Sequence, residues 1–277
     1  MISALFIAFR EGLEAALIVA IVIGYLIKIG RKQRVRYAWA GVLAAVAASA
    51  ALAFGIQAIG AKLEGRAEQL FEGATMILAV GVLTWMIFWM RYQSRTMKSA
   101  LEREVHSAVS LGHNWGLAAV AFVAVFREGV ETALFLSAAA FASDGMGTLL
   151  GASLGLTLAA LAGYLIYASS VRLNVRMFFG VTSVLLLVFA AGLLAHGVHE
   201  FQEAGVLPTL NQHVWNTNPI LDEKSPVGEV LKAVVGYNGN PSLEEVVAYG
   251  AYWLLALVGV RWWVDRKFAH SMATARV

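Results

Sequence analysis

The chain contains no cysteine and little charge. Disulfide bonds and thiolate metal ligands are therefore excluded, and any metal site would have to use oxygen or imidazole ligands. Only 14% of the 277 residues are charged and 59% are hydrophobic, whereas a soluble domain carries about 25% charged residues. This composition predicts an all-α polytopic membrane protein.

Two further absences narrow the function. No Gly-x4-Gly-Lys-Ser/Thr loop occurs, so transport would depend on a gradient, the membrane potential or partner proteins rather than on bound ATP. No basic segment precedes the first apolar run, which predicts a retained helix rather than a signal peptide. The net charge is +3, but the basic residues stand in short loops beside apolar stretches, so we expect no nucleic-acid partner.

Seven apolar stretches are long enough to cross a lipid bilayer as helices, which takes roughly 20 residues each. They cover residues 2–27, 37–59, 71–90, 115–142, 146–169, 178–195 and 246–263. Every second connecting loop is rich in Lys and Arg. The positive-inside rule then predicts an N-terminus outside and a C-terminus in the cytoplasm.

One pentad occurs twice within this apolar sequence, as Arg-Glu-Gly-Leu-Glu at residues 10–14 and as Arg-Glu-Gly-Val-Glu at residues 127–131. Its flanking apolar residues place the charges near the middle of the membrane. Six charges facing lipid would cost roughly 15–20 kcal/mol, which exceeds the ~5–15 kcal/mol stability of a typical protein. The pentads must therefore face the interior of the bundle.

The spacing within each pentad puts its two glutamates on one helical face, with the arginine close enough to fold back on a carboxylate. The six residues are Glu11, Glu14, Glu128 and Glu131, with Arg10 and Arg127. Together they carry a formal charge of minus two, which a bound cation or protons could balance. A purely structural network would be expected to balance its own charge, so the surplus favours transport of a cation.

The two pentads belong to spans of opposite direction, and a second echo accompanies them. Phe-x-Gly-x-Thr-x-x-Leu opens the third span at residues 71–78 and the sixth at residues 178–185. Both echoes predict an inverted repeat within a single transmembrane domain, and such transporters bind substrate at the repeat interface near the midplane. The predicted parts are repeat one at residues 1–91, repeat two at residues 115–203, an extracytoplasmic loop at residues 204–245 and a seventh helix at residues 246–263.

Two smaller features concern packing and the outer loop. Gly151 and Gly155 are four residues apart in the fifth span, a spacing that lets two helices approach closely. The outer loop contains all four prolines of the chain and is predicted to include a short amphipathic helix at about residues 227–235. This loop would either cap the mouth of the bundle or receive a partner protein.

A second group of metal-ligating side chains is predicted at the outer mouth. Four members share one helical face just beyond the sixth span, namely His196, His199, Glu200 and Glu203. The fifth member, Glu72, stands at the start of the third span. Imidazole and carboxylate groups there would collect metal ions before passage. A solvated helix end is the alternative that this spacing leaves open.

The doubled Arg-Glu-x-x-Glu motif (REXXE) at residues 10–14 and 127–131 resembles that of the oxidase-dependent iron transporters, the high-affinity iron permeases. The length, the seven predicted spans and the outer N-terminus look most like the bacterial branch of this family. The resemblance implies that the four pentad glutamates ligate iron during passage and that both pentad arginines balance charge. It also implies a bacterial inner-membrane location and iron as a transported substrate rather than a permanently bound cofactor.

The same resemblance implies partners for the chain besides the lipid bilayer. A periplasmic iron-oxidising or iron-delivering protein would hand over ferric iron at the outer mouth, although ferrous uptake is also ascribed to the bacterial branch. Oligomerisation stays open. In the leading interpretation the chain is a permease and not an enzyme, and one repeat rocks against the other to release the ion.

Two alternatives remain on the residues alone. A membrane di-iron oxidase could use paired Glu-x-x-Glu helices, but such sites typically add a Glu-x-x-His motif, which neither pentad has. A proton-coupled carrier of another divalent metal or solute could use the glutamates as proton relays.

Overall fold

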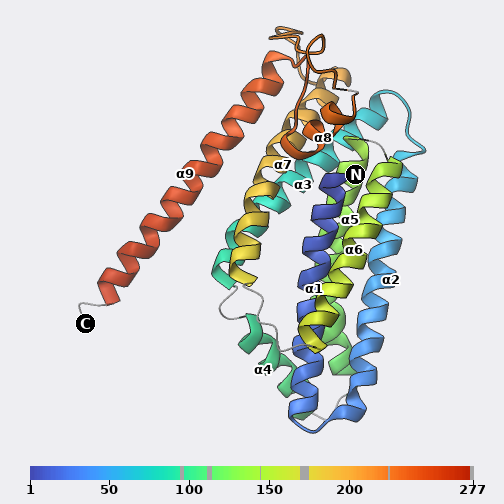
Figure 1. Cartoon of the computed structure of the whole chain (residues 1–277), viewed down its shortest axis with the longest axis vertical. Helices are drawn as coiled ribbons and strands as arrows, with labels where there is room; N and C mark the ends of the chain where they lie inside the picture. Colours follow the sequence, from blue (N-terminus) through green and yellow to red (C-terminus); the bar gives the residue numbers. More distant parts are fainter. Residues whose placement is uncertain (94–96, 111–113, 144, 169–174, 224, 275–277) are drawn as a thin grey trace.

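The computed structural model describes residues 1–93, 97–110, 114–143, 145–168, 175–223 and 225–274. Over these residues the chain is helical and contains no strand (Figure 1). The α-helices are α1 (Ile2–Lys28), α2 (Val35–Gly60), α3 (Arg66–Gln93), α4 (Met97–Ser110), α5 (Asn114–Phe141), α6 (Gly145–Ala168), α7 (Val175–Glu203), α8 (Pro226–Val235) and α9 (Leu243–Thr274). The predicted all-helical fold is confirmed, while residues 144 and 169–174 of the predicted second repeat lie outside the described residues.

Within the described part of the chain, four segments are long and apolar enough to cross a membrane, judged by length and composition: Lys32–Gly60, Arg66–Ile87, Gly145–Leu165 and Gly180–Glu203. Helices α1 and α5 have the length, with 27 and 28 residues, but each carries the three charges of a pentad. The number of seven spans, the inverted repeat and the orientation of the termini stay predictions.

Helices α1, α2, α5 and α6 form a four-helix group, in which α1 packs along α6, α2 packs along α5, and α1 also contacts α5 (Figure 1). Glycine makes the first of these contacts close. A β-carbon at Gly151 would overlap the carbonyl oxygen of Met1, and one at Gly155 would overlap that of Leu5. The close helix packing predicted at both glycines is confirmed.

Helices α3 and α7 pack against each other and form a second group with α9, which packs on α7. A β-carbon at Gly73 of α3 would lie 3.1 Å from Cβ of Glu200 and 3.2 Å from the carbonyl oxygen of Gly197, both on α7. The hydroxyl groups of Thr84 on α3 and Tyr252 on α9 are 3.0 Å apart. Buried apolar side chains join this group to α1 and α5.

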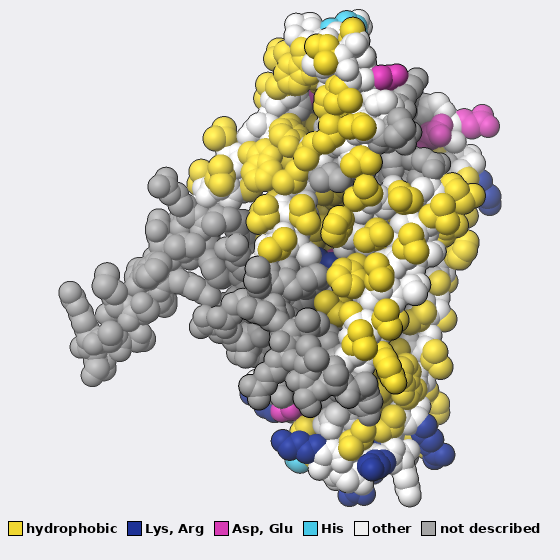
Figure 2. All heavy atoms as spheres, viewed as in Figure 1, with side chains coloured by type: hydrophobic (Ala, Val, Ile, Leu, Met, Phe, Trp, Pro, Cys, Tyr) yellow, Lys and Arg dark blue, Asp and Glu magenta, His cyan; other side chains and the backbone are white. Residues whose placement is uncertain are grey.

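The two ends of the bundle differ in charge. Figure 2 shows hydrophobic side chains over the middle of the visible face and Lys and Arg gathered at the lower end. The lower end holds the turn between α1 and α2, while α1 and α9 both begin at the upper end, near α8 (Figure 1). Large apolar side chains along the helices are exposed, for example Phe54 at 78% and Trp85 at 73%, as expected where a surface faces lipid.

One helix lies where the sequence suggested a basic loop. Helix α4 buries Leu101, Val105 and Ala108 against α1 and α5, and its other side is largely exposed. Apolar residues at positions i, i+4 and i+7 form one stripe of a helix, so the many charges between them hid an amphipathic helix. With 14 residues, α4 is too short to span a bilayer.

Helix α8 confirms the short helix predicted in the outer loop. Ser225 caps its first turn by accepting a hydrogen bond from the amide of Gly228, and Pro226 occupies the first turn, where its missing N–H is not needed. Gly236 ends the helix with a φ of 68°, a left-handed conformation that favours glycine.

Candidate metal centre

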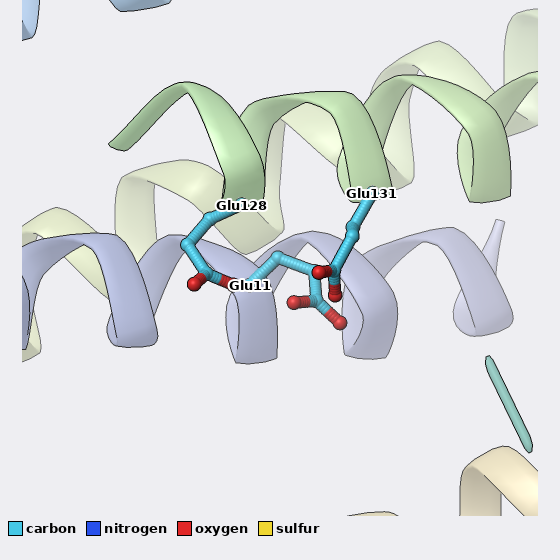
Figure 3. A group of neighbouring side chains, drawn as sticks. All are labelled: Glu11, Glu128 and Glu131. Carbon is cyan, nitrogen blue, oxygen red and sulfur yellow. The ribbon is translucent and has the colours of Figure 1, made fainter. Parts of the chain in front are cut away.

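The two pentads meet because α1 and α5 lie side by side in the four-helix group. Glu128 and Glu131 of α5 point toward Glu11 of α1 (Figure 3). One carboxylate oxygen from each of these three residues lies within 4.8 Å of the other two. Within the six described ranges, no other group of three or more His, Asp or Glu side chains meets this condition.

The three charged residues of the first pentad are buried. Arg10 is 1% exposed, and its guanidinium group contacts both glutamates of its own pentad. Nη1 donates a hydrogen bond to Oε1 of Glu11, and Nη2 lies 3.0 Å from Oε1 of Glu14 as an ion pair. Glu14 faces the same arginine as Glu11, but it is not one of the three residues whose carboxylates converge.

The second pentad is more open. The side chain of Arg127 is 39% exposed, against 2% for Glu128 and 15% for Glu131. Arg127 donates to Oε1 of Glu128, whereas its Nε lies 3.8 Å from Oε1 of Glu131, a looser pair. The arginine of this pentad thus holds one glutamate firmly and leaves the other nearly free.

One oxygen of each clustered carboxylate has no hydrogen-bond partner in the described part of the chain. These atoms are Oε2 of Glu11, Oε2 of Glu128 and Oε2 of Glu131, and all three are buried. A buried acceptor without a partner costs about 1–3 kcal/mol, and more when it is charged. A cation bound between the three carboxylates would satisfy these oxygens, and hard oxygen ligands suit iron, manganese, magnesium or calcium.

The glycine in the middle of each pentad lets another helix pack closely beside it. A β-carbon at Gly12 would lie 2.8 Å from Cβ of Ala159 on α6, and one at Gly129 would lie 2.6 Å from Cβ of Ser49 on α2. Both glycines sit on a different helical face from the glutamates. Sequence reasoning missed this role, although both glycines stand inside the repeated motif.

Helix α3 supplies two contacts that sequence reasoning also missed. Nη1 of Arg10 lies 3.2 Å from the sulfur of Met86, and the guanidinium carbon of Arg127 lies 4.7 Å from the ring centroid of Trp89. A methionine and a tryptophan in an apolar span look like ordinary core or lipid-facing residues. No sequence signal marked them.

At the outer end, the structure brings together two of the five predicted residues with a third that was not predicted. Nε2 of His199 lies 3.2 Å from Oε1 of Glu203, and Nδ1 lies 3.0 Å from Oε1 of Glu245 on α9. Gln69 donates a 3.0 Å hydrogen bond to the other oxygen of Glu203. These groups are bonded to one another rather than left free for a metal.

The remaining outer candidates lie near this network. The ring centroids of His196 and His199 are 6.0 Å apart. Glu72 is partly buried and lies close enough to Glu200 and Glu68 for mutual repulsion. A role of the five residues in collecting metal stays a prediction.

Glu245 is the centre of the outer network and is only 3% exposed. Besides His199, it accepts hydrogen bonds from Nδ2 of Asn238 at 2.6 Å and from the hydroxyl of Ser242 at 3.1 Å. Burial opposes ionisation, but the hydrogen bonds from His199 and Ser242 outweigh it and lower the pKa of Glu245. The Ser-x-x-Glu spacing of a helix-capping box at residues 242–245 could have indicated from the sequence that Glu245 accepts hydrogen bonds at the start of α9.

Apolar helices around a buried acidic cluster define an all-helical membrane protein with a candidate cation site in its interior. Residues 1–265 match the iron permease FTR1 family, and the chain belongs to that family. The resemblance to high-affinity iron permeases is thereby confirmed.

Two similar proteins are named ferrous iron permease EfeU. The protein from Escherichia coli O6:H1, strain CFT073, is 39% identical over 254 residues, which are 91% of this chain and 92% of that protein. The protein from Yersinia pestis is 38% identical over 254 residues, 91% of this chain and 90% of that protein. No solved structure matches the chain.

Proposed function

We propose that the chain is a permease that carries iron across the bacterial inner membrane through a site formed by Glu11, Glu128 and Glu131. One observation carries this proposal. In a member of an iron permease family, two buried carboxylates and one partly buried carboxylate from two helices converge within 4.8 Å, and each keeps one buried oxygen without a hydrogen-bond partner among the described residues. An iron ion is the cargo of this site and not a resident cofactor.

Charge balance supports ferrous iron as the cargo. The four pentad glutamates and two arginines carry a formal charge of minus two, which one divalent ion neutralises. The similar proteins from E. coli and Y. pestis are named ferrous iron permeases. The expectation of ferric iron, supplied by a periplasmic oxidising partner, stays a prediction that the experiment below tests.

Reciprocal packing supports the inverted repeat. If α1 to α3 and α5 to α7 are equivalent, the first helix of each repeat packs along the second helix of the other, as α1 on α6 and α5 on α2. The third helices, α3 and α7, pack on each other. The pentad glycines follow the same rule, because Gly12 faces α6 and Gly129 faces α2.

This interlaced packing argues against rocking of one whole repeat against the other. Such a motion would separate α1 from α6 and α2 from α5, where glycines hold the backbones in close contact. A movement of the α3–α7 pair relative to the four-helix group keeps both contacts intact. We therefore assign release of the ion to that movement.

At the outer mouth we retain Glu72, His196 and Glu200 as residues that attract cations, because acidic groups concentrate there. His199 and Glu203 instead tie the end of α7 to its neighbours by hydrogen bonds. A periplasmic iron-delivering protein would dock on the outer loop and α8. An oligomeric state follows from none of these contacts.

Uptake of radiolabelled iron into proteoliposomes tests the proposed function. Ferrous iron kept reduced and ferric iron as a chelate are compared at a fixed membrane potential, with Mn2+ as a competing divalent ion. We expect ferrous uptake by the wild-type chain and almost none by Glu11→Gln or Glu128→Gln. Wild-type uptake by both variants would remove the carboxylate cluster from the mechanism.

Two assays on the same purified protein address the alternatives. The similar proteins are named permeases and not enzymes, so we expect no iron-dependent oxygen consumption. Iron-dependent oxygen consumption that is lost in Glu11→Gln would favour a di-iron oxidase. A Mn2+ titration that detects no binding would favour a proton-coupled carrier of another solute.

A further inference from the structure

Helix α3 contacts the arginines of both pentads, although it carries neither pentad itself. Met86 approaches Arg10 of α1, and Trp89 approaches Arg127 of α5. Met86 and Trp89 are three residues apart and therefore share one face of α3. A single helical face thus meets the positive charges that come from both predicted repeats.

The chemistry of both contacts suits holding an arginine without neutralising it. A thioether sulfur is a weak hydrogen-bond acceptor and carries no charge, and Met86 is only 4% exposed. An indole ring attracts a guanidinium group through its π face. Neither side chain competes with the glutamates as a counter-ion, but each fixes where its arginine lies.

The position of each arginine decides which carboxylate oxygens remain free. Arg10 and Arg127 each engage Oε1 of the neighbouring glutamate, while Oε2 of Glu11, Oε2 of Glu128 and Oε2 of Glu131 have no partner among the residues described. Arg127 already lies 3.8 Å from Oε1 of Glu131. A shift of Arg127 toward Glu131 would tighten this loose pair and bring a positive charge closer to the carboxylates, where it competes with a bound cation.

We propose that Met86 and Trp89 are positioning residues, which hold both pentad arginines on the α3 side of the carboxylates and thereby keep the ion-binding oxygens available. The inference rests on the proposed function, because the ion site is the one proposed there. It adds that α3 couples the two parts of the molecule. A movement of α3 relative to the four-helix group shifts both arginines at once and changes the affinity of the site.

The test is the concentration dependence of ferrous iron uptake by Trp89→Leu. Once the ring is lost, Arg127 pairs with Glu131 and competes with the ion, so we expect KM to rise about 3- to 30-fold, the range of a cation–π contact. The maximum rate per inserted protein changes much less. Trp89→Phe retains an aromatic face and should restore KM to within about 3-fold of the wild type.

Trp85→Leu is the matched control, because Trp85 lies one turn away on α3 and is 73% exposed. We expect a wild-type KM for this variant. Met86→Leu keeps the volume of the side chain but removes the sulfur, and a KM rise of about 2- to 5-fold is expected from the loss of a weak acceptor. An equal KM rise in Trp85→Leu, or a wild-type KM in both Trp89→Leu and Met86→Leu, would overturn the inference.

Equilibrium binding of Mn2+ to the purified full chain separates this inference from the proposed function. Weaker Mn2+ binding by Trp89→Leu, with recovery in Trp89→Phe, supports positioning of the arginine even if the wild type takes up no iron. In that case only the proposed iron transport fails. If Mn2+ binding is the same in the wild type, Trp89→Leu and Met86→Leu, the positioning role is wrong whatever the transport assay shows.

Discussion

The central and outer clusters both contain metal-ligating residue types, yet they differ in how their polar atoms are satisfied. In the central cluster three buried carboxylate oxygens have no hydrogen-bond partner in the described structure. In the outer network both nitrogens of His199 face carboxylates, and Glu245 accepts from three side chains. Only a doubly protonated ring can donate to both carboxylates. This difference is the reason why we propose the central cluster, and not the outer network, as the cation site.

The largest expected effect is on iron uptake, and it should appear when a charge is removed from the central cluster but not when one is removed from the outer network. Glu11→Gln removes a carboxylate that has a free oxygen, and we expect ferrous iron uptake to fall roughly 100-fold or more, since a buried partner of a bound cation is lost. Glu203→Gln at the outer network should change uptake by less than about 3-fold, because exposed ion pairs contribute little. Initial uptake rates normalised to inserted protein measure both.

Glu14→Gln sharpens this comparison within one helix. Glu14 pairs with Arg10 and lies outside the group of three carboxylates, so its effect on KM should be smaller than that of Glu11→Gln. A loss of Mn2+ binding in Glu14→Gln equal to that in Glu11→Gln would show that all four glutamates ligate the ion, as the resemblance implied.

The second-largest effect is on the stability of the fold, and it comes from removing the arginines that compensate the central carboxylates. Arg10→Leu leaves two buried carboxylates without their arginine and should destabilise the fold by about 3–5 kcal/mol. Arg127→Leu removes a side chain that is 39% exposed, and we expect a loss of about 1–2 kcal/mol. Thermal unfolding in detergent compares the two variants. The measured quantity is the fraction of protein that remains in the folded, monodisperse peak after heating. An equal loss of stability would contradict the difference in burial between the pentads.

The third effect tests whether the pentad glycines serve packing. Gly12→Ala and Gly129→Ala introduce a methyl group against Ala159 and Ser49 respectively, and overpacking of this kind costs about 1–3 kcal/mol. The same unfolding measurement should show recovery in the double variant Gly129→Ala with Ser49→Gly. Gly24→Ala is the control, because a β-carbon at Gly24 meets nothing within 4 Å. A loss in Gly24→Ala equal to that in Gly129→Ala would disprove the packing role.

Much of the central site could be predicted from the sequence, because its signals are local. Charges inside apolar stretches require an interior position, and the spacing of Gly151 and Gly155 predicts a close helix contact that the structure contains. The separation of Glu11 from Glu14 could not be predicted, since both share a helical face and Arg10 contacts both. Only the placement of α5 brings Glu128 and Glu131 close to Glu11.

Other features depended on contacts between distant parts of the chain. His199 meets Glu245 across 46 positions, and Met86 meets Arg10 across 76. The periodicity of apolar residues in the sequence does not indicate such long-range pairs. Helix α4 was missed for a different reason, because its charged residues obscured the stripe formed by Leu101, Val105 and Ala108.

The smallest effect belongs to the outer network and depends on pH. Burial opposes ionisation of Glu245, but hydrogen bonds from His199 and Ser242 lower its pKa below the ordinary value of 4.5. A carboxyl group with a lowered pKa stabilises the fold fully above its unfolded pKa and loses this contribution as pH falls through the folded pKa. Glu245→Gln should therefore be less stable than the wild type by about 1–3 kcal/mol at pH 6 to 7, and the difference should shrink below about pH 4.5.

Melting temperatures of the wild type and Glu245→Gln between pH 3.5 and 7 measure this effect. Glu244→Gln is the control on the same helix turn, because Glu244 is less buried than Glu245 and accepts its hydrogen bonds from the amide of Leu210 and from Nε2 of Gln202 rather than from His199. Ferrous iron uptake at pH 7 should stay within about 3-fold of the wild type in both variants, since the outer network holds α7 to α9 and no central ligand is altered. Loss of iron uptake in Glu245→Gln without loss of stability would mean that the outer network handles the ion directly, and the contrast between the two clusters would then be wrong.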